Sequence, residues 1–122
     1  MMKRVSMFCD AADGASTLAA DVLVANRYFS RLRGLIGHPP LQPGRGLWIV
    51  PTQQVHTHFM GAPIDVIFLD RDMKVLRVVP ALAPWKLSPW VKGARSALEL
   101  AAGTAATVAV GDRLVARPCG HE

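Results

Sequence analysis

The sequence predicts a mainly β fold: a compact sandwich or barrel of jelly-roll-like type with one short α-helix. Three observations lead to this prediction. Short segments rich in β-branched and apolar residues recur along the whole chain. Glycine, proline and aspartate separate these segments, and only one stretch has the apolar spacing of a helix. About eight short strands with one helix are more typical of a sandwich or barrel than of alternating β-α-β units.

Three strands are expected in the first half of the chain. Residues 1–9 and 17–25 are rich in apolar and β-branched residues, and the turn-forming residues 10–14 lie between them. This arrangement predicts two strands joined as a hairpin. Residues 47–50 form a shorter strand that ends at Pro51, because proline cannot donate a hydrogen bond to a neighbouring strand.

One helix is predicted, over residues 27–36. Asn26 is a suitable N-cap, and Tyr28, Leu32 and Leu35 then follow at helical spacing. A glycine and two prolines come directly after the segment and end the helix.

The second half of the chain alternates extended segments with polar or proline-rich turns. Residues 64–69 and 75–79 are predicted to form a hairpin with roughly five loop residues. Prolines make the section that follows irregular. The remaining predicted elements are extended segments at residues 55–60 and 96–100, one helical turn within 103–109, and a turn with the last strand within 110–116.

Composition excludes several classes of protein. A chain of 122 residues, 51% hydrophobic and 19% charged, predicts a single folded domain over residues 1–122. No apolar run approaches the roughly 20 residues of a membrane helix, and residues 1–10 lack the apolar region of a secretory signal. We therefore expect a cytoplasmic protein with Cys9 and Cys119 as free thiols; a disulfide between them is the alternative if the first and last strands are neighbours.

The net charge of +5 raises the question of anionic partners. The arginines and lysines are dispersed, however, and no basic tract or RNA-binding signature is present. We expect no specific binding of nucleic acid and no membrane span. The expected partner is a small ligand or another protein.

The most informative segment is His-Thr-His-Phe-Met at residues 56–60. If this segment is extended, His56, His58 and Met60 share one face. The two imidazoles with the carboxylate of Asp65 would suit zinc or copper, and Met60 in place of Asp65 would favour copper. The alternatives are a small-ligand pocket or a structural role for the histidines. No cofactor is predicted, and a bound transition metal is kept as an alternative.

Two carboxylates and two tryptophans complete the candidate site. Asp65 and Glu99 lie in apolar segments, so each needs donors or a cation. The candidate partners of Asp65 are His56, an arginine of the helix at 27–33, and backbone N–H groups of the turn at 61–63. The carboxylates either belong to a structural network or share a cavity with His56 for acid–base chemistry. Trp85 and Trp90, in a proline-broken loop, either anchor a ligand or partner or cap the fold.

Three motifs, taken in order, resemble the bacterial family called domain of unknown function 192. They are Arg-Leu-Arg-Gly-Leu-Ile-Gly at residues 31–37, the segment 55–70, and the segment from Ala-Leu-Glu-Leu to Val-Gly-Asp at residues 97–112. The likeness spans roughly residues 18–117. It implies a compact, mainly β, jelly-roll-like fold, and it supplies no activity because the family has none established.

The resemblance also ranks individual positions. The family pattern has residues matching Met60, Asp65 and Glu99. A branch of the family resembles this chain in having His-Thr at His56-Thr57, and that branch more often holds an apolar residue at the position of His58. This counts against a metal site shared by the family. No nucleophile-elbow pattern G-x-S-x-G is present.

The sequence therefore favours a small, non-enzymatic module that binds a ligand or partner. Its candidate binding residues are His56, Met60, Asp65, Glu99, Trp85 and Trp90. The alternative is a metal-dependent enzyme of cupin-like architecture that uses His56 and His58 with Asp65 or Glu99.

Overall fold

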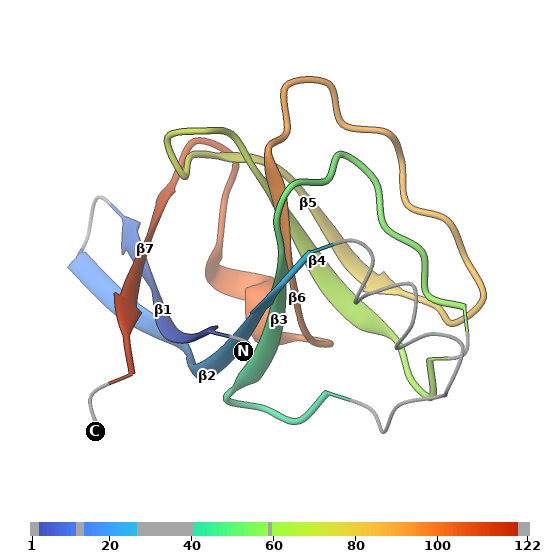
Figure 1. The fold of residues 1–122 in the computed structure, drawn as a ribbon, viewed down its shortest axis with the longest axis horizontal. Coiled ribbons are helices and arrows are strands. Elements are labelled where there is room, and N and C mark those ends of the chain that lie inside the picture. The colour runs from blue at the N-terminus through green and yellow to red at the C-terminus, as the bar shows by residue number, and fades with distance from the viewer. Residues whose placement is uncertain (1–2, 12–13, 27–40, 59, 120–122) are drawn as a thin grey trace.

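The computed structural model describes residues 3–11, 14–26, 41–58 and 60–119, which form seven strands in one sheet (Figure 1). The strands are β1 (Lys3–Ala11), β2 (Gly14–Ala25), β3 (Arg45–Ile49), β4 (Ile64–Leu69), β5 (Val75–Leu82), β6 (Ser96–Ala101) and β7 (Arg113–Pro118). A short 3₁₀-helix, η1 (Thr104–Thr107), precedes β7. The mainly β class is thus confirmed. The helix predicted over residues 27–36 lies outside the described residues.

The sheet follows the order β5-β4-β6-β3-β2-β1-β7. Every neighbouring pair is antiparallel except β2 and β3, which run parallel. The hairpin β1–β2 was predicted, and the structure extends both of its strands toward the turn. No helix among the described residues has the length and apolar character needed to cross a membrane.

The two edge strands of the sheet approach each other at one end. The N–H of Val75 donates to the carbonyl of Asp112 at 2.7 Å, and that of Leu114 donates to Met73 at 2.9 Å. Figure 1 shows the β4–β5 turn beside the start of β7. These contacts curl the seven strands into a half-barrel, so the fold is one curved sheet rather than two packed sheets.

The β4–β5 turn is held by Asp70. Its Oδ1 atom accepts hydrogen bonds from the N–H groups of Lys74 and Asp72, at 3.0 and 2.8 Å. The bond from Lys74 is the main reason why the pKa of Asp70 lies below its ordinary value. This self-contained turn explains why the hairpin could be predicted from local sequence.

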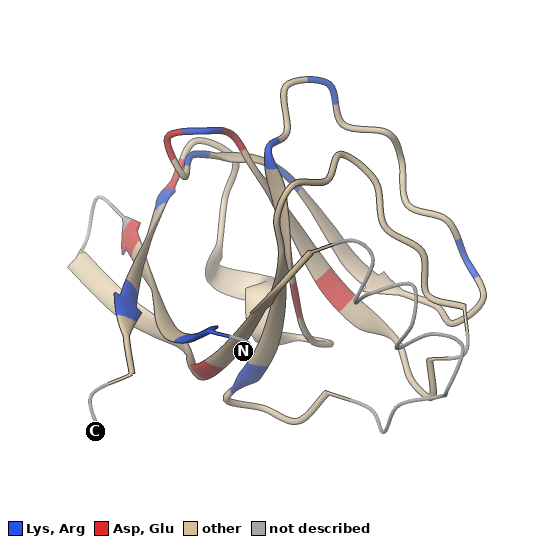
Figure 2. Cartoon of the chain, viewed as in Figure 1, with Lys and Arg blue, Asp and Glu red and all other residues tan. Residues whose placement is uncertain are grey.

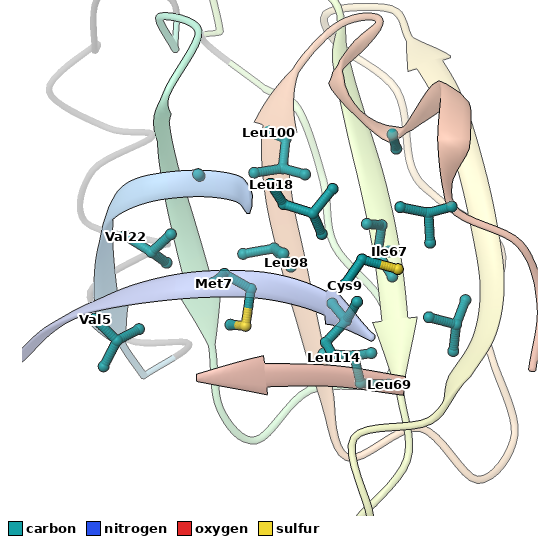
Figure 3. Close-up of a cluster of buried hydrophobic side chains, with 14 residues drawn as sticks. Val5, Met7, Cys9, Leu18, Val22, Ile67, Leu69, Leu98, Leu100 and Leu114 are labelled. Atoms are coloured by element: carbon teal, nitrogen blue, oxygen red, sulfur yellow. The ribbon is translucent and has the colours of Figure 1, made fainter. Parts of the chain in front are cut away.

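A core of buried side chains lies inside the curve of the sheet (Figure 3). We call it the inner core. Its residues come from strands at both ends of the sheet, so the inner core lies on the concave side. Cys9 is one of its members. Cys9 contacts Asp112 whereas Cys119 contacts the carbonyl of Ala20, and both cysteines are free thiols.

A second group of buried side chains packs on the opposite face of β3, β4 and β6, and we call it the outer core. Its members are Ala25, Leu47, Ile49, Val55, Met60, Ile64, Val66, Phe68, Val91, Ala94 and Ala97. The central strands β4 and β6 are therefore buried on both faces. This explains why their sequences are almost continuously apolar instead of alternating.

Gly46 lies on β3 opposite Leu100 of β6, with no room for a side chain. A Cβ atom at this position would lie 2.9 Å from both the carbonyl oxygen of Glu99 and a methyl group of Leu100. We expect Gly46→Ala to lower the free energy of unfolding by about 1–3 kcal/mol, because the two strands must separate. Urea denaturation would measure this loss. The exposed β2 substitution Ser16→Ala is the control, and equal stability of the two variants would contradict the expectation.

Candidate functional site

Residues 53–58 and 85–91 pair with each other outside the sheet, and we call this pair of segments the outer ribbon. The N–H groups of Val91, Ser88 and Thr57 donate to the carbonyls of Gln53, Val55 and Lys86, each at 2.9 Å. An isolated antiparallel bridge joins His56 to Leu87. Residues 55–60 were predicted to be extended; the structure pairs residues 55–57 with the tryptophan loop, outside any strand of the sheet.

Thr57 holds the two segments of the outer ribbon together through hydrogen bonds. Its side chain is fully buried, and its hydroxyl donates to the carbonyl of Ala83 at 2.6 Å while accepting from the N–H of Lys86 at 2.8 Å. Its carbonyl accepts the N–H of Trp85 at 3.0 Å. These bonds hold Trp85 at a φ of 64°, a left-handed conformation that bulky residues rarely adopt. Thr57 thereby sets the backbone from which Trp85 projects.

The structure brings His56 and His58 together. Their ring centroids are 5.0 Å apart, and the N–H of His58 donates to Nδ1 of His56 at 3.3 Å. An acceptor at Nδ1 favours the neutral tautomer with its proton on Nε2. The ring of His58 also meets that of Trp85 edge to face, with centroids 5.5 Å apart. Two histidines and one tryptophan thus form a partly exposed aromatic cluster.

Met60 does not join this cluster. Its N–H donates to the carbonyl of Thr57 at 3.1 Å, which makes a turn, and its side chain is buried in the outer core. The prediction that Met60 shares a face with His56 and His58 is therefore wrong. The turn breaks the alternation of side chains on which that prediction depended.

Asp65 is buried, and its carboxylate accepts three backbone hydrogen bonds. Oδ1 accepts from Ala81, and Oδ2 accepts from Gly103 and Ala105, each at 2.9 Å. The carboxylate ties the end of β5 and the start of η1 to β4. The donors expected from the sequence were His56, the turn at 61–63 or an arginine of residues 27–33. The three observed donors come from elsewhere in the fold, and residues 27–33 lie outside the described residues.

Glu99 lies on the opposite face of the sheet from Asp65. In the register of the strands it stands beside Leu47 and Val66, which belong to the outer core, and its side chain is fully buried. Asp65 alternates with outer-core residues along β4 and so points to the inner side. The two carboxylates therefore do not share a cavity.

The predicted metal ligands are also separated. His56 and His58 lie in the outer ribbon, whereas Asp65 is engaged by backbone N–H groups at η1. Among the residues that the structure describes, no three histidine, cysteine, aspartate or glutamate side chains are grouped closely enough to hold an ion. The geometry therefore gives the set His56, His58 and Asp65 no support as a metal centre.

A groove of about 460 Å³ runs along the outer ribbon. It brings together His56 and Trp90, two of the residues singled out from the sequence. Its other lining residues are Ile49, Pro51, Thr52, Gln53, Gln54, Val55, Ala94 and Arg95. Sequence reasoning missed the polar members of this set, because neither two adjacent glutamines nor one arginine forms a recognisable motif.

The groove and the outer ribbon lie in a positively charged part of the chain. Residues 41–64 and 73–98 contain no aspartate or glutamate. The cations near the ribbon are Lys86, Lys92 and Arg95, and all three are exposed. Figure 2 shows basic but no acidic positions along the segment between β5 and β6. The electrostatic field here favours an anionic ligand.

Comparison with known proteins supports the fold and leaves the activity open. The model of the DUF192 family, described as "Uncharacterized ACR", matches residues 10–116. A protein of unknown function from Novosphingobium aromaticivorans has a similar structure, with a TM-score of 0.77, 19% identity, and 92% of this chain and 84% of that chain covered. A protein named a putative transcription regulator from Sinorhizobium meliloti has a TM-score of 0.80 and 22% identity, with 94% and 95% covered. Curated protein sequences show no significant match.

Proposed function

The chain belongs to the DUF192 family, whose function is not established, and from this premise we propose that it is a small ligand-binding module. The proposed site is the groove beside His56 and Trp90. The observation that carries the proposal is the convergence of polar groups from two distant segments on one groove of about 460 Å³. This volume falls within the range of roughly 300–1,000 Å³ that is typical of small-molecule sites.

The lining of the groove indicates the class of ligand. Arg95 and Gln53 carry hydrogen-bond donors, and none of the described residues that line the groove is a carboxylate. The indole of Trp90 adds a flat apolar wall, suited to a ring or the apolar face of a sugar. We infer that the ligand is a small carboxylate or phosphate with a ring attached. A guanidinium recognises either anion through paired hydrogen bonds.

Binding of this class of ligand can be tested with simple anionic probes. Benzoate, phenyl phosphate and glucuronate would be compared with neutral benzyl alcohol and glucose in a thermal-unfolding assay. A probe present at about ten times its Kd stabilises the protein by roughly 1.4 kcal/mol, which raises Tm by about 5 °C in a domain of this size. We expect at least one anionic probe, and neither neutral one, to produce such a shift.

Two arginine variants locate the binding. Arg95 is the one arginine or lysine among the described residues that line the groove, and we expect Arg95→Gln to abolish the shift. Arg77→Gln is the matched control, because Arg77 is exposed on β5 and does not line the groove. Equal shifts with neutral probes, or equal loss in both variants, would contradict the proposal.

A further inference from the structure

One six-residue stretch of the outer ribbon, residues 85–90, exposes three large apolar side chains. Trp85, Leu87 and Trp90 have 57%, 61% and 64% of their surface exposed. Among the described residues, only Val110 is a comparably exposed large apolar side chain, and it lies elsewhere in the chain. The segment 84–90 runs along the outer rim of the molecule, away from the C-terminus (Figure 1). Apolar exposure concentrated in this way marks an interaction surface.

The same rim carries positive charge. Lys86 lies between the exposed Trp85 and Leu87, and Lys92 follows Trp90; both lysines are exposed. The nearest acidic residues along the sequence are Asp72 and Glu99, and Glu99 is fully buried. Figure 2 shows the resulting rim with basic positions only. A partner that covers this rim must therefore offer both apolar contact and negative charge.

We propose that the rim formed by Trp85, Leu87 and Trp90, with Lys86 and Lys92, docks onto the surface of an anionic lipid bilayer. Tryptophan prefers the boundary between headgroups and acyl chains, because its ring is apolar while its N–H can still donate. The side chain of Leu87 is removed from water in the same apolar layer, which favours binding. The lysines meet the anionic headgroups, and each strengthens binding by roughly fivefold near such a surface.

A nucleic acid is also polyanionic, but the structure favours a bilayer as the partner of the rim. Single-stranded nucleic acid stacks its bases on aromatic rings, and the exposed Leu87 offers nothing for stacking. The outer ribbon is also preorganised, because the buried hydroxyl of Thr57 holds the backbone on both sides of Trp85. A loop that is already ordered loses little conformational entropy when it docks.

Flotation with lipid vesicles tests the proposal. The protein would be mixed with vesicles of phosphatidylcholine, with and without phosphatidylglycerol, and the tryptophan emission followed. We expect binding and a blue shift only with phosphatidylglycerol present. Leu87→Asn should weaken binding by about tenfold, and Lys86→Gln/Lys92→Gln by roughly twenty-fivefold. The matched controls are Val110→Asn and Lys3→Gln/Lys74→Gln, which change equally exposed residues outside the rim.

Other outcomes would overturn the proposal. The first is that the protein does not bind vesicles that contain phosphatidylglycerol. The second is that the rim variants and their controls weaken vesicle binding equally. Binding of oligothymidylate without vesicle binding would assign the rim to nucleic acid. A dimer lost in Leu87→Asn without vesicle binding would assign it to self-association. Because Leu87 and the lysines do not line the groove, these results are independent of the Arg95→Gln test.

Discussion

Asp65→Asn is expected to lower the free energy of unfolding by about 3–5 kcal/mol. The buried carboxylate accepts hydrogen bonds from Ala81, Gly103 and Ala105, and each bond to a charged group contributes roughly 1.5–3 kcal/mol. Asparagine keeps one acceptor oxygen, but its NH₂ group would face backbone donors. At least one of the three backbone N–H groups then loses its partner. Urea denaturation followed by circular dichroism would measure the loss.

Asp70→Asn is the matched control for this experiment. Asp70 also accepts two backbone hydrogen bonds, but in an exposed turn where water can replace the lost acceptor. We expect its cost to be about 1 kcal/mol. Similar losses in the two variants would show that the buried position of Asp65 is not what makes its carboxylate important.

Thr57→Val is expected to lower the free energy of unfolding by about 2–4 kcal/mol. Valine has nearly the same shape, so the packing is preserved and the hydroxyl alone is removed. The carbonyl of Ala83 and the N–H of Lys86 then lose their partner in a partly buried site, at roughly 1–2 kcal/mol each. Denaturation would give the magnitude. We also expect increased hydrogen exchange at the amides of Trp85 and Lys86, which depend on Thr57.

Thr57→Ser separates the hydroxyl from the methyl group. Serine keeps both hydrogen bonds, so we expect near-native exchange at residues 85 and 86 and a loss of only about 1 kcal/mol. If serine and valine caused the same loss, the stabilisation would come from packing of the methyl group and not from the hydroxyl.

Local patterns were sufficient to predict most of the strands. Residues 64–69 were predicted to be a strand and are β4 with the same bounds, and the turn at Asp70 is held by its own neighbours. The segment at 96–100 is β6, and the predicted helical turn corresponds to η1. These elements could be predicted because apolar runs and turn-forming residues are local patterns, although β4 and β6 pair with each other and β6 pairs with β3 across long stretches of sequence.

The candidate site was less predictable, because its geometry depends on long-range pairing. His56 meets Leu87 across the outer ribbon, and a turn from Thr57 to Met60 buries the thioether that strict alternation would place beside the histidines. The inference that buried carboxylates need donors was correct for Asp65, yet its donors are 16 to 40 residues distant in the chain. No local pattern identifies such partners.

The sequence by itself determined the mainly β class, the family, the position of most strands and the polar character of the segment at 56–58. Periodicity and turn chemistry act between near neighbours, so these features can be inferred without coordinates. Only the tertiary structure decided that Asp65 and Glu99 face opposite sides of the sheet, and that His56 shares a groove with Trp90 and Arg95. Strand register and loop pairing join residues far apart in the chain, and the resulting contacts leave no periodic trace in sequence.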